Sequence, residues 1–112
     1  MGYRKYKPQK NASAGISNII VALCADYDRR KTAICEKSVS KRVRMEYLYI
    51  NTRMFEAAAE TVGFGAAETF IQEIGSGTGY AGTKIEYMAE STYKVMKGRI
   101  KNNMAKKLYL CD

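Results

Sequence analysis

Apolar residues recur at spacings of three and four along nearly the whole chain, and its single proline stands at position 8. Residues three and four apart share one face of an α-helix, whereas the side chains of a strand alternate with a period of two. No stretch alternates in that way, and no proline after Pro8 interrupts a helical pattern. The sequence therefore predicts an all-α protein of about five helices.

The first two predicted helices form a long N-terminal pair. The first spans Ser13–Glu36, begins at a residue type that caps helices, and carries an apolar stripe over Ile16–Ile34. The second spans Ser40–Gly63 and ends at glycine, a frequent C-terminal cap, with an apolar stripe over Val43–Val62. These stripes are longer than a short third helix can cover, so we expect the protein to associate with itself as a homodimer.

Glycines separate the shorter helices that follow. The third predicted helix, AAETFIQEI, lies between Gly65 and Gly75, and the loop GSGTG follows it. A fourth, short helix is predicted over Tyr80–Ala89, and a fifth runs from Thr92 to about Tyr109. A short helix, a tight break and a longer helix give the outline of a helix-turn-helix within about residues 80–110.

The net charge of +8 is distributed in blocks. It is +4 over residues 1–10, +4 over 11–45, −5 over 46–90 and +5 over 91–112. We expect residues 1–12 to form a flexible basic arm and residues 13–112 to form a single helical domain. Basic blocks suit a polyanionic partner, nucleic acid before any other. The acidic block indicates a solvated face, or one that meets a basic protein.

The residue inventory argues against an enzyme. The chain has no histidine, the commonest general base, and its three cysteines have no C-x-x-C spacing. We therefore expect reduced thiols in a cytoplasmic protein, with no metal and no cofactor. No run of about 18 apolar residues is present, so no membrane span is predicted.

Two other features each allow a functional interpretation beside a structural one. The loops GFGAAE and GSGTGY have the glycine content of phosphate-binding loops, but both follow amphipathic helical sequence rather than a buried strand, so we interpret them as helix ends. The segment DYDRRK indicates a solvated helix end, with phosphate contact from Arg29, Arg30 and Lys31 as the alternative.

The last predicted helix has the most unusual pattern. No acidic residue occurs from Ser91 to Leu110, although solvated helices usually mix charges of both signs. Ser91 is predicted to cap this helix. A buried stripe is expected at Tyr93, Met96, Ile100, Met104 and Leu108, and a solvent face at Lys94, Lys97 and Lys101.

These faces predict how the helix would meet DNA. The N-terminal turn of a recognition helix reaches the base edges of the major groove, so Thr92, Lys94 and Tyr93 are the candidate groove-facing residues. Phosphate contacts position a protein without specifying sequence. For these the candidates are Lys84, Lys97, Arg99 and Lys101.

The stretch MAESTYKVMKGRIKNNMAKKLYL also resembles the C-terminal end of phage-encoded transcriptional regulators of the ArpU/RinA type, in which a sigma-factor-like helix-turn-helix ends in a related pattern. Ser91, Tyr93, Ala105 and Leu108 carry the resemblance, and the helical first half is similar in layout. The resemblance implies a non-enzymatic regulator encoded by a phage or prophage and acting in the bacterial cytoplasm. Double-stranded DNA is its implied partner, with host RNA polymerase as a second candidate.

Two other roles remain open at this point. A small terminase-like subunit that recognises viral DNA for packaging would need the same basic helix. A phage structural or assembly adaptor would instead use that helix to bind an acidic protein. A regulator should bind one defined duplex far better than random DNA. A packaging subunit should form a large ring, and an adaptor should not bind DNA at moderate salt.

Overall fold

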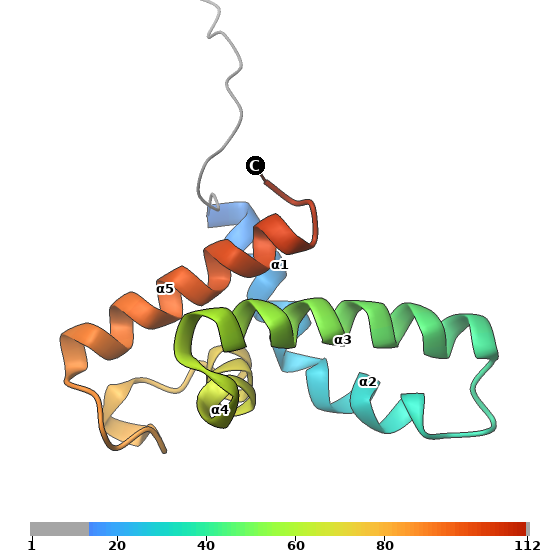
Figure 1. The fold of residues 1–112 in the computed structure, drawn as a ribbon, viewed down its shortest axis with the longest axis horizontal. Coiled ribbons are helices and arrows are strands. Elements are labelled where there is room, and N and C mark those ends of the chain that lie inside the picture. Colours follow the sequence, from blue (N-terminus) through green and yellow to red (C-terminus); the bar gives the residue numbers. More distant parts are fainter. Residues whose placement is uncertain (1–13, 112) are drawn as a thin grey trace, which may run out of the picture.

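The computed structural model describes residues 14–111, which form five α-helices and one turn of 3-10 helix (Figure 1). The helices are α1 (Ala14–Ala25), α2 (Tyr27–Ile34), α3 (Lys41–Val62), α4 (Phe64–Ser76) and α5 (Glu90–Lys107), and the 3-10 turn η1 is Tyr80–Gly82. The described residues contain no strand, so the all-α prediction is confirmed. The predicted basic arm and the cap at Ser13 lie outside the described residues.

The first predicted helix is in fact two, because the chain bends at Asp26 between α1 and α2. The guanidinium group of Arg30 lies at this bend and is 2% exposed. It donates hydrogen bonds to the carbonyl oxygen of Leu23 at 2.6 Å and to Oδ1 of Asn51 on α3 at 2.7 Å. A side chain that binds helix carbonyls in this way is a recognised cause of a kink.

Helix α3 matches its predicted range closely because its end signals are local. Helix α4 runs two residues beyond its predicted range at each end, through Gly65 and Gly75. The hydroxyl of Ser40 accepts a hydrogen bond from the backbone N–H of Val43 at 3.3 Å, which caps α3 as predicted. Gly63 ends α3 with φ of +85°, a conformation that favours glycine, and α4 begins at the next residue. Helix α4 ends in a left-handed glycine, Gly77.

The predicted fourth helix, Tyr80–Ala89, is wrong. Only η1 is helical there, and the chain from Thr83 to Ala89 is irregular. Polar groups of this segment make other hydrogen bonds instead. Within the segment, the hydroxyl of Tyr80 donates to the carbonyl oxygen of Met88 at 2.8 Å. The side chain of Thr83 and the backbone N–H of Lys84 donate to Glu73 on α4. The first helix of the predicted helix-turn-helix is therefore absent, and α5 follows an irregular lead-in.

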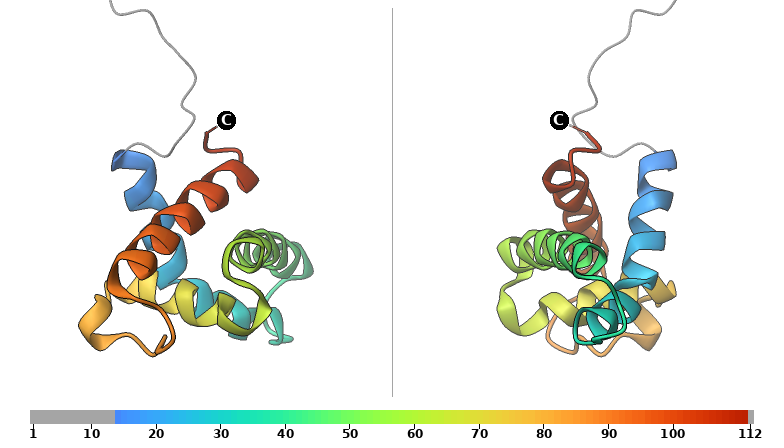
Figure 2. Two further views of the ribbon diagram at one scale, coloured as in Figure 1. Left: turned by 60° about the vertical axis from the view of Figure 1, so that its left-hand side comes forward. Right: turned by 90° about the vertical axis from the view of Figure 1, so that its right-hand side faces the viewer.

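The core lies where α1, α4, α5 and the second half of α3 meet. Its fully buried side chains include Ile20, Met54, Phe70, Ile100 and Met104. Helix α2 and the first half of α3 extend beyond this body as an antiparallel hairpin, which Figure 1 shows projecting from the other helices and the right view of Figure 2 shows nearly end-on. None of the helices in residues 14–111 combines the length and hydrophobicity that a bilayer-spanning segment requires.

Two helices of the body cross closely at a glycine. A β-carbon added at Gly75 on α4 would lie 2.5 Å from the backbone nitrogen of Ala25 on α1. Only glycine permits this approach without movement of the backbone. The glycines are interpreted from the sequence as helix ends, but Gly75 lies within α4. Its role is to set the distance between α4 and α1.

Candidate nucleic-acid interface

A buried carboxylate on α4, Glu73, positions the lead-in segment and the start of α5. Its oxygens accept hydrogen bonds from the hydroxyl of Tyr93 at 2.6 Å, the backbone N–H of Lys84 at 2.8 Å and the hydroxyl of Thr83. Burial acts to raise the pKa of Glu73, but these hydrogen bonds outweigh it and hold the pKa below its ordinary value. The prediction that this glutamate belongs to a solvated face is therefore wrong.

Tyr93 anchors α5 rather than facing solvent. Its side chain is 1% exposed and packs between the rings of Phe70 and Tyr80, at centroid distances of 5.4 Å and 5.7 Å. Burial, and then the neighbouring Glu73, raise the pKa of its phenol. A residue in this position cannot reach a DNA groove. The prediction of Tyr93 as a groove-facing residue is wrong, whereas its place in the buried stripe is confirmed.

Lys97 also points inward, contrary to the predicted solvent face. Its ammonium group donates to the carbonyl oxygen of Thr78 at 2.7 Å and lies 5.1 Å from the centroid of the Tyr93 ring. Burial and the nearby charge of Lys101 lower its pKa, and the attraction of Glu73 opposes them. Lys97 therefore helps to hold α5 against the lead-in segment.

Apart from Tyr93, the first turn of α5 is exposed to solvent. The N-cap residue is Ala89, without a side-chain cap, so the predicted cap at Ser91 is wrong. Ser91, Thr92 and Lys94 are exposed, and the ammonium group of Lys94 pairs with Glu90 of the same turn at 2.8 Å. Such an exposed pair has a small net energy, so Lys94 can exchange it for another anion.

The outward-facing positions of α5 form one continuous stripe, which we call the outer face. Its members follow one another at helical spacings and are exposed or half-buried: Ser91, Thr92, Val95, Arg99, Asn102 and Lys106. Lys94 and Lys101 flank the stripe on one side, with Gly98 between them. A β-carbon added at Gly98 would meet nothing within 4 Å, so the surface there is flat and open.

A polar cleft of about 440 Å³ lies beside the second half of the outer face, between α5 and the end of α3. Arg99 and Lys106 line it together with Asn102 and Asn103. Its carboxylate, Glu60, is already engaged by Lys107 at 2.8 Å, and that hydrogen bond lowers the pKa of Glu60. The cleft therefore offers two cationic side chains without ion-pair partners among the described residues.

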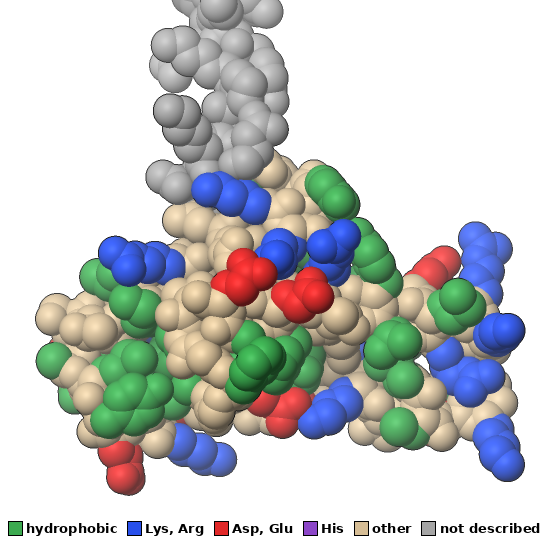
Figure 3. All heavy atoms as spheres, in the orientation of Figure 1, with side chains coloured by type: hydrophobic (Ala, Val, Ile, Leu, Met, Phe, Trp, Pro, Cys, Tyr) green, Lys and Arg blue, Asp and Glu red, His purple; other side chains and the backbone are tan. Residues whose placement is uncertain are grey.

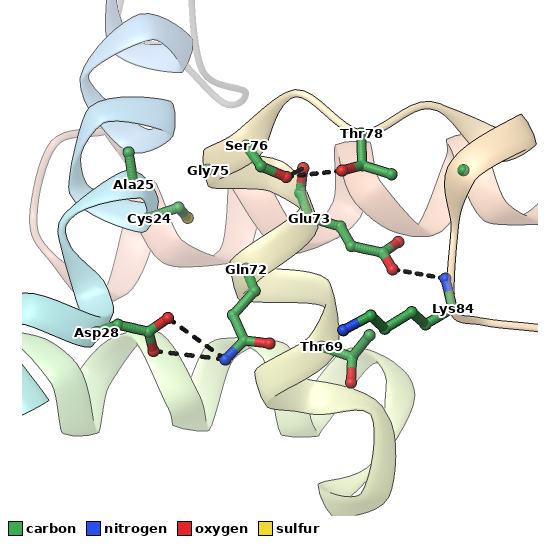
Figure 4. A pocket seen from close by; sticks show the side chains of 11 residues that line it. Cys24, Ala25, Asp28, Thr69, Gln72, Glu73, Gly75, Ser76, Thr78 and Lys84 are labelled. Atoms are coloured by element: carbon green, nitrogen blue, oxygen red, sulfur yellow. Dashed lines mark hydrogen bonds between the residues drawn. The ribbon is translucent and has the colours of Figure 1, made fainter.

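Lys84, a predicted phosphate contact, does not lie beside the outer face of α5. It is exposed, but it lines a different cavity of about 510 Å³ between α4, the bend after α1 and the segment after α4 (Figure 4). Cys24 lies at the same cavity, and burial raises the pKa of its thiol to about 12, so it is protonated and unreactive at neutral pH. Within residues 14–111 no three His, Cys, Asp or Glu side chains group as metal ligands do, and the cysteines are free.

The segment DYDRRK gives little support to phosphate binding. Arg29 forms a bidentate pair with Asp26 at 2.7 Å, Lys31 pairs with Glu68 at 2.6 Å, and Arg30 is buried.

Basic side chains gather instead at the free end of the α2–α3 hairpin (Figure 3). They belong to the stretch KSVSKRVR, and they are Lys37, Lys41, Arg42 and Arg44. The sequence interpretation missed this group, although its local density of charge is visible in the sequence.

Comparisons of the chain with protein-family models, with curated proteins and with solved structures found no match.

Proposed function

We propose that the protein binds double-stranded DNA by placing the outer face of α5 in the major groove. The observation that carries this proposal is the chemistry of α5, which holds six basic residues and one acidic residue. The acidic residue, Glu90, precedes the outer face and pairs with Lys94. The outer face itself presents hydroxyl, amide and cationic groups, which are the groups that read base edges and bind phosphates.

The order of these groups along α5 fits a helix that enters the groove by its N-terminus. Its first turn carries Ser91 and Thr92, which can bond to either type of base edge, and then the apolar Val95, which suits a thymine methyl group. The open surface at Gly98 allows the DNA backbone to approach the helix closely. Thr92 and Lys94 therefore remain as groove-facing candidates, and Val95 takes the place predicted for Tyr93.

The phosphate contacts are assigned to four exposed or half-buried cations of α5. Among the described residues only Lys94 of these four forms an ion pair, the exposed one with Glu90. Arg99 and Lys106 lie beside the polar cleft, and Lys94 and Lys101 flank the outer face. If all four contact phosphates, a log–log plot of affinity against salt should have a slope of about −3.6, from roughly −0.9 per phosphate neutralised. Lys97 and Lys84 are left out of this set.

The core of the protein supports α5 although the helix predicted at Tyr80–Ala89 is absent. Helix α4 supplies Glu73 and Phe70, which fix Tyr93 in the first turn of α5. Rigid support of this kind is needed because base readout depends on the placement of a few side chains. We assign to α4 and the lead-in segment the supporting role that the first helix has in a helix-turn-helix.

The resemblance to phage regulators makes transcription regulation in a bacterial cytoplasm the role we propose, without catalysis or a cofactor. Contact with host RNA polymerase belongs to the same proposal. A packaging subunit would form a large ring, and an assembly adaptor would not prefer one duplex sequence. Selection of bound duplexes from a random pool, followed by sedimentation of the complex, therefore distinguishes these three roles.

The location of the DNA surface can be tested with two charge-matched variants. Arg99→Gln with Lys106→Gln removes two cations from the outer face, and Lys37→Gln with Lys41→Gln removes two from the hairpin end. We expect the first pair to weaken binding at least about tenfold at moderate salt and to reduce the salt slope by about 1.8. We expect the second pair to leave the slope within about 0.5 of the parent value.

Equal unfolding curves for both variants would show that the changes act on binding alone, as surface substitutions usually do. The proposal would be wrong if the hairpin pair removed binding while the α5 pair did not. It would also be wrong if the parent protein bound no duplex at low salt, since four cations on and beside the outer face should then give measurable nonspecific affinity.

A further inference from the structure

Three large apolar side chains on α3 lie in solvent within little more than one helical turn. They are Met45 (60% exposed), Leu48 (52%) and Tyr49 (47%). An apolar groove of about 400 Å³ lies between α2 and α3, and Leu48 lines it together with Ile34 and Phe55. Apolar groups concentrated in this way on a surface mark an interaction site, whereas apolar residues exposed singly do not.

This surface is not the stripe from which self-association was predicted. The stripe over Val43–Val62 faces inward, and its second half is buried against α4 and α5 at Met54, Ala57 and Ala58. The exposed apolar residues lie on the opposite side of α3. The part of the sequence-based reason for a homodimer that rested on α3 is therefore removed, and α3 offers a different surface.

The two ends of the exposed side of α3 carry opposite charges. Arg42 lies seven residues before Tyr49, and Glu56 lies seven residues after it, about two helical turns or 10.5 Å in each direction. Both side chains are exposed and only loosely paired: Arg42 with Glu46 at 3.4 Å and Glu56 with Arg53 at 3.9 Å. Pairs of this kind exchange easily for better ones.

We propose that this side of α3 binds a second copy of the chain, with the two α3 helices antiparallel about a two-fold axis near Tyr49. Equal spacing on both sides of Tyr49 then puts Arg42 of each copy opposite Glu56 of the other. Met45 and Leu48 of each copy then lie in the apolar part of the contact, with Leu48 next to the groove that it lines. A two-fold contact repeats every pair twice, so a surface that complements itself in charge and shape suits a homodimer.

The basic hairpin end favours the antiparallel arrangement over a parallel one. Lys37, Lys41 and Arg44 lie at the same end of the hairpin as Arg42. Parallel pairing would bring these cations of the two copies together, and like charges at an interface are strongly unfavourable. Antiparallel pairing separates the two basic ends by the length of the contact and leaves them in solvent.

Sedimentation velocity of the full chain without DNA tests the contact, so its result is independent of the proposed DNA binding. We expect a reversible change from the 12.6 kDa monomer to a dimer between about 1 and 100 µM. Leu48→Asp should raise the dissociation constant at least about tenfold. Ile19→Asp is the matched control, because Ile19 is 48% exposed on α1, and it should leave the constant within about threefold.

A charge exchange tests the register. Arg42→Glu alone and Glu56→Arg alone should each weaken the dimer at least about tenfold, because each places like charges opposite one another twice. The double variant restores opposite charges across the contact and should return to within about threefold of the parent. Thermal melting of each variant checks that the fold is intact.

Three results would contradict the proposed antiparallel dimer. A monomer throughout the concentration range would show that the surface does not bind a second copy. A dimer unaffected by Leu48→Asp would lie on another surface. A dimer weakened by Leu48→Asp but not restored by the double charge exchange would contradict the antiparallel register.

Discussion

The phenol of Tyr93 in the first turn of α5 donates a 2.6 Å hydrogen bond to the buried carboxylate of Glu73, twenty residues earlier on α4. This bond connects the helix that carries the candidate DNA surface to the core of the body. Both partners are almost fully buried, at 1% and 6% exposure. A buried hydrogen bond to an ionised group is among the stronger ones in proteins.

Tyr93→Phe should reduce the free energy of unfolding by about 1.5–3 kcal/mol, since it removes this bond without opening a cavity. Urea denaturation followed by circular dichroism measures the change. Tyr87→Phe is the control, because Tyr87 is 71% exposed, and its stability should stay within about 0.5 kcal/mol of the parent. A similar loss in both variants would mean that the Tyr93–Glu73 bond does not stabilise the protein.

Stability should fall in acid partly through Glu73. Its pKa is lower in the folded protein than in the unfolded chain, so its contribution is complete above about pH 4.3 and is lost as pH falls through the folded pKa. Glu73→Gln should therefore be less stable than the parent at pH 6, and the difference should narrow toward pH 3. Denaturation at both pH values measures it, with exposed Glu86→Gln as the control. A difference that is constant with pH would contradict this account.

Two glycines in helices should respond to alanine in opposite directions. Gly75→Ala should cost about 1–3 kcal/mol, because its new methyl group would overlap the backbone of α1 at Ala25. Gly98→Ala should instead stabilise the protein by about 0.5–1 kcal/mol, because the site is open and alanine favours the helix. Denaturant midpoints measure both changes. Destabilisation by Gly98→Ala would show that the outer face of α5 is not open.

Lys94 and Lys97 lie three residues apart on α5 but should differ in their effect on stability. Lys97→Gln should cost about 1–2 kcal/mol, because it removes a charge-assisted bond to Thr78 and a contact with the Tyr93 ring. Lys94→Gln should leave stability within about 0.5 kcal/mol, because its pair with Glu90 is exposed. Equal melting temperatures for the two variants would mean that Lys97 is as free in solution as Lys94.

Local signals in the sequence were sufficient for part of the fold. The range of α3 follows from Ser40 and Gly63, which lie next to the backbone groups they cap. The buried positions Tyr93, Ile100 and Met104 follow from spacings within one helix. Prediction succeeds in these cases because the cause lies within a few residues of its effect.

The errors have causes that lie far away in the sequence. The bend at Asp26 depends on Arg30 meeting Asn51, 21 residues later, and the loss of the fourth helix depends on Glu73 attracting Thr83 and Lys84. Lys97 turns inward because Thr78 presents a carbonyl group to it. Helical periodicity cannot reveal such contacts, because tertiary hydrogen bonds override local preference.

The hydrogen bonds of Arg30 at the bend after α1 also bear on the order in which the helices form. Helix α2 has eight residues, and an isolated helix of that length is not stable in water. The acceptor that holds Arg30, Asn51, belongs to α3, and its amide group also donates to the carbonyl oxygen of Tyr27 at the start of α2. Helix α2 can therefore persist only once α3 has formed beside it. We therefore expect the 22-residue α3 to form first and to act as the template on which the short helix before it in the chain becomes stable.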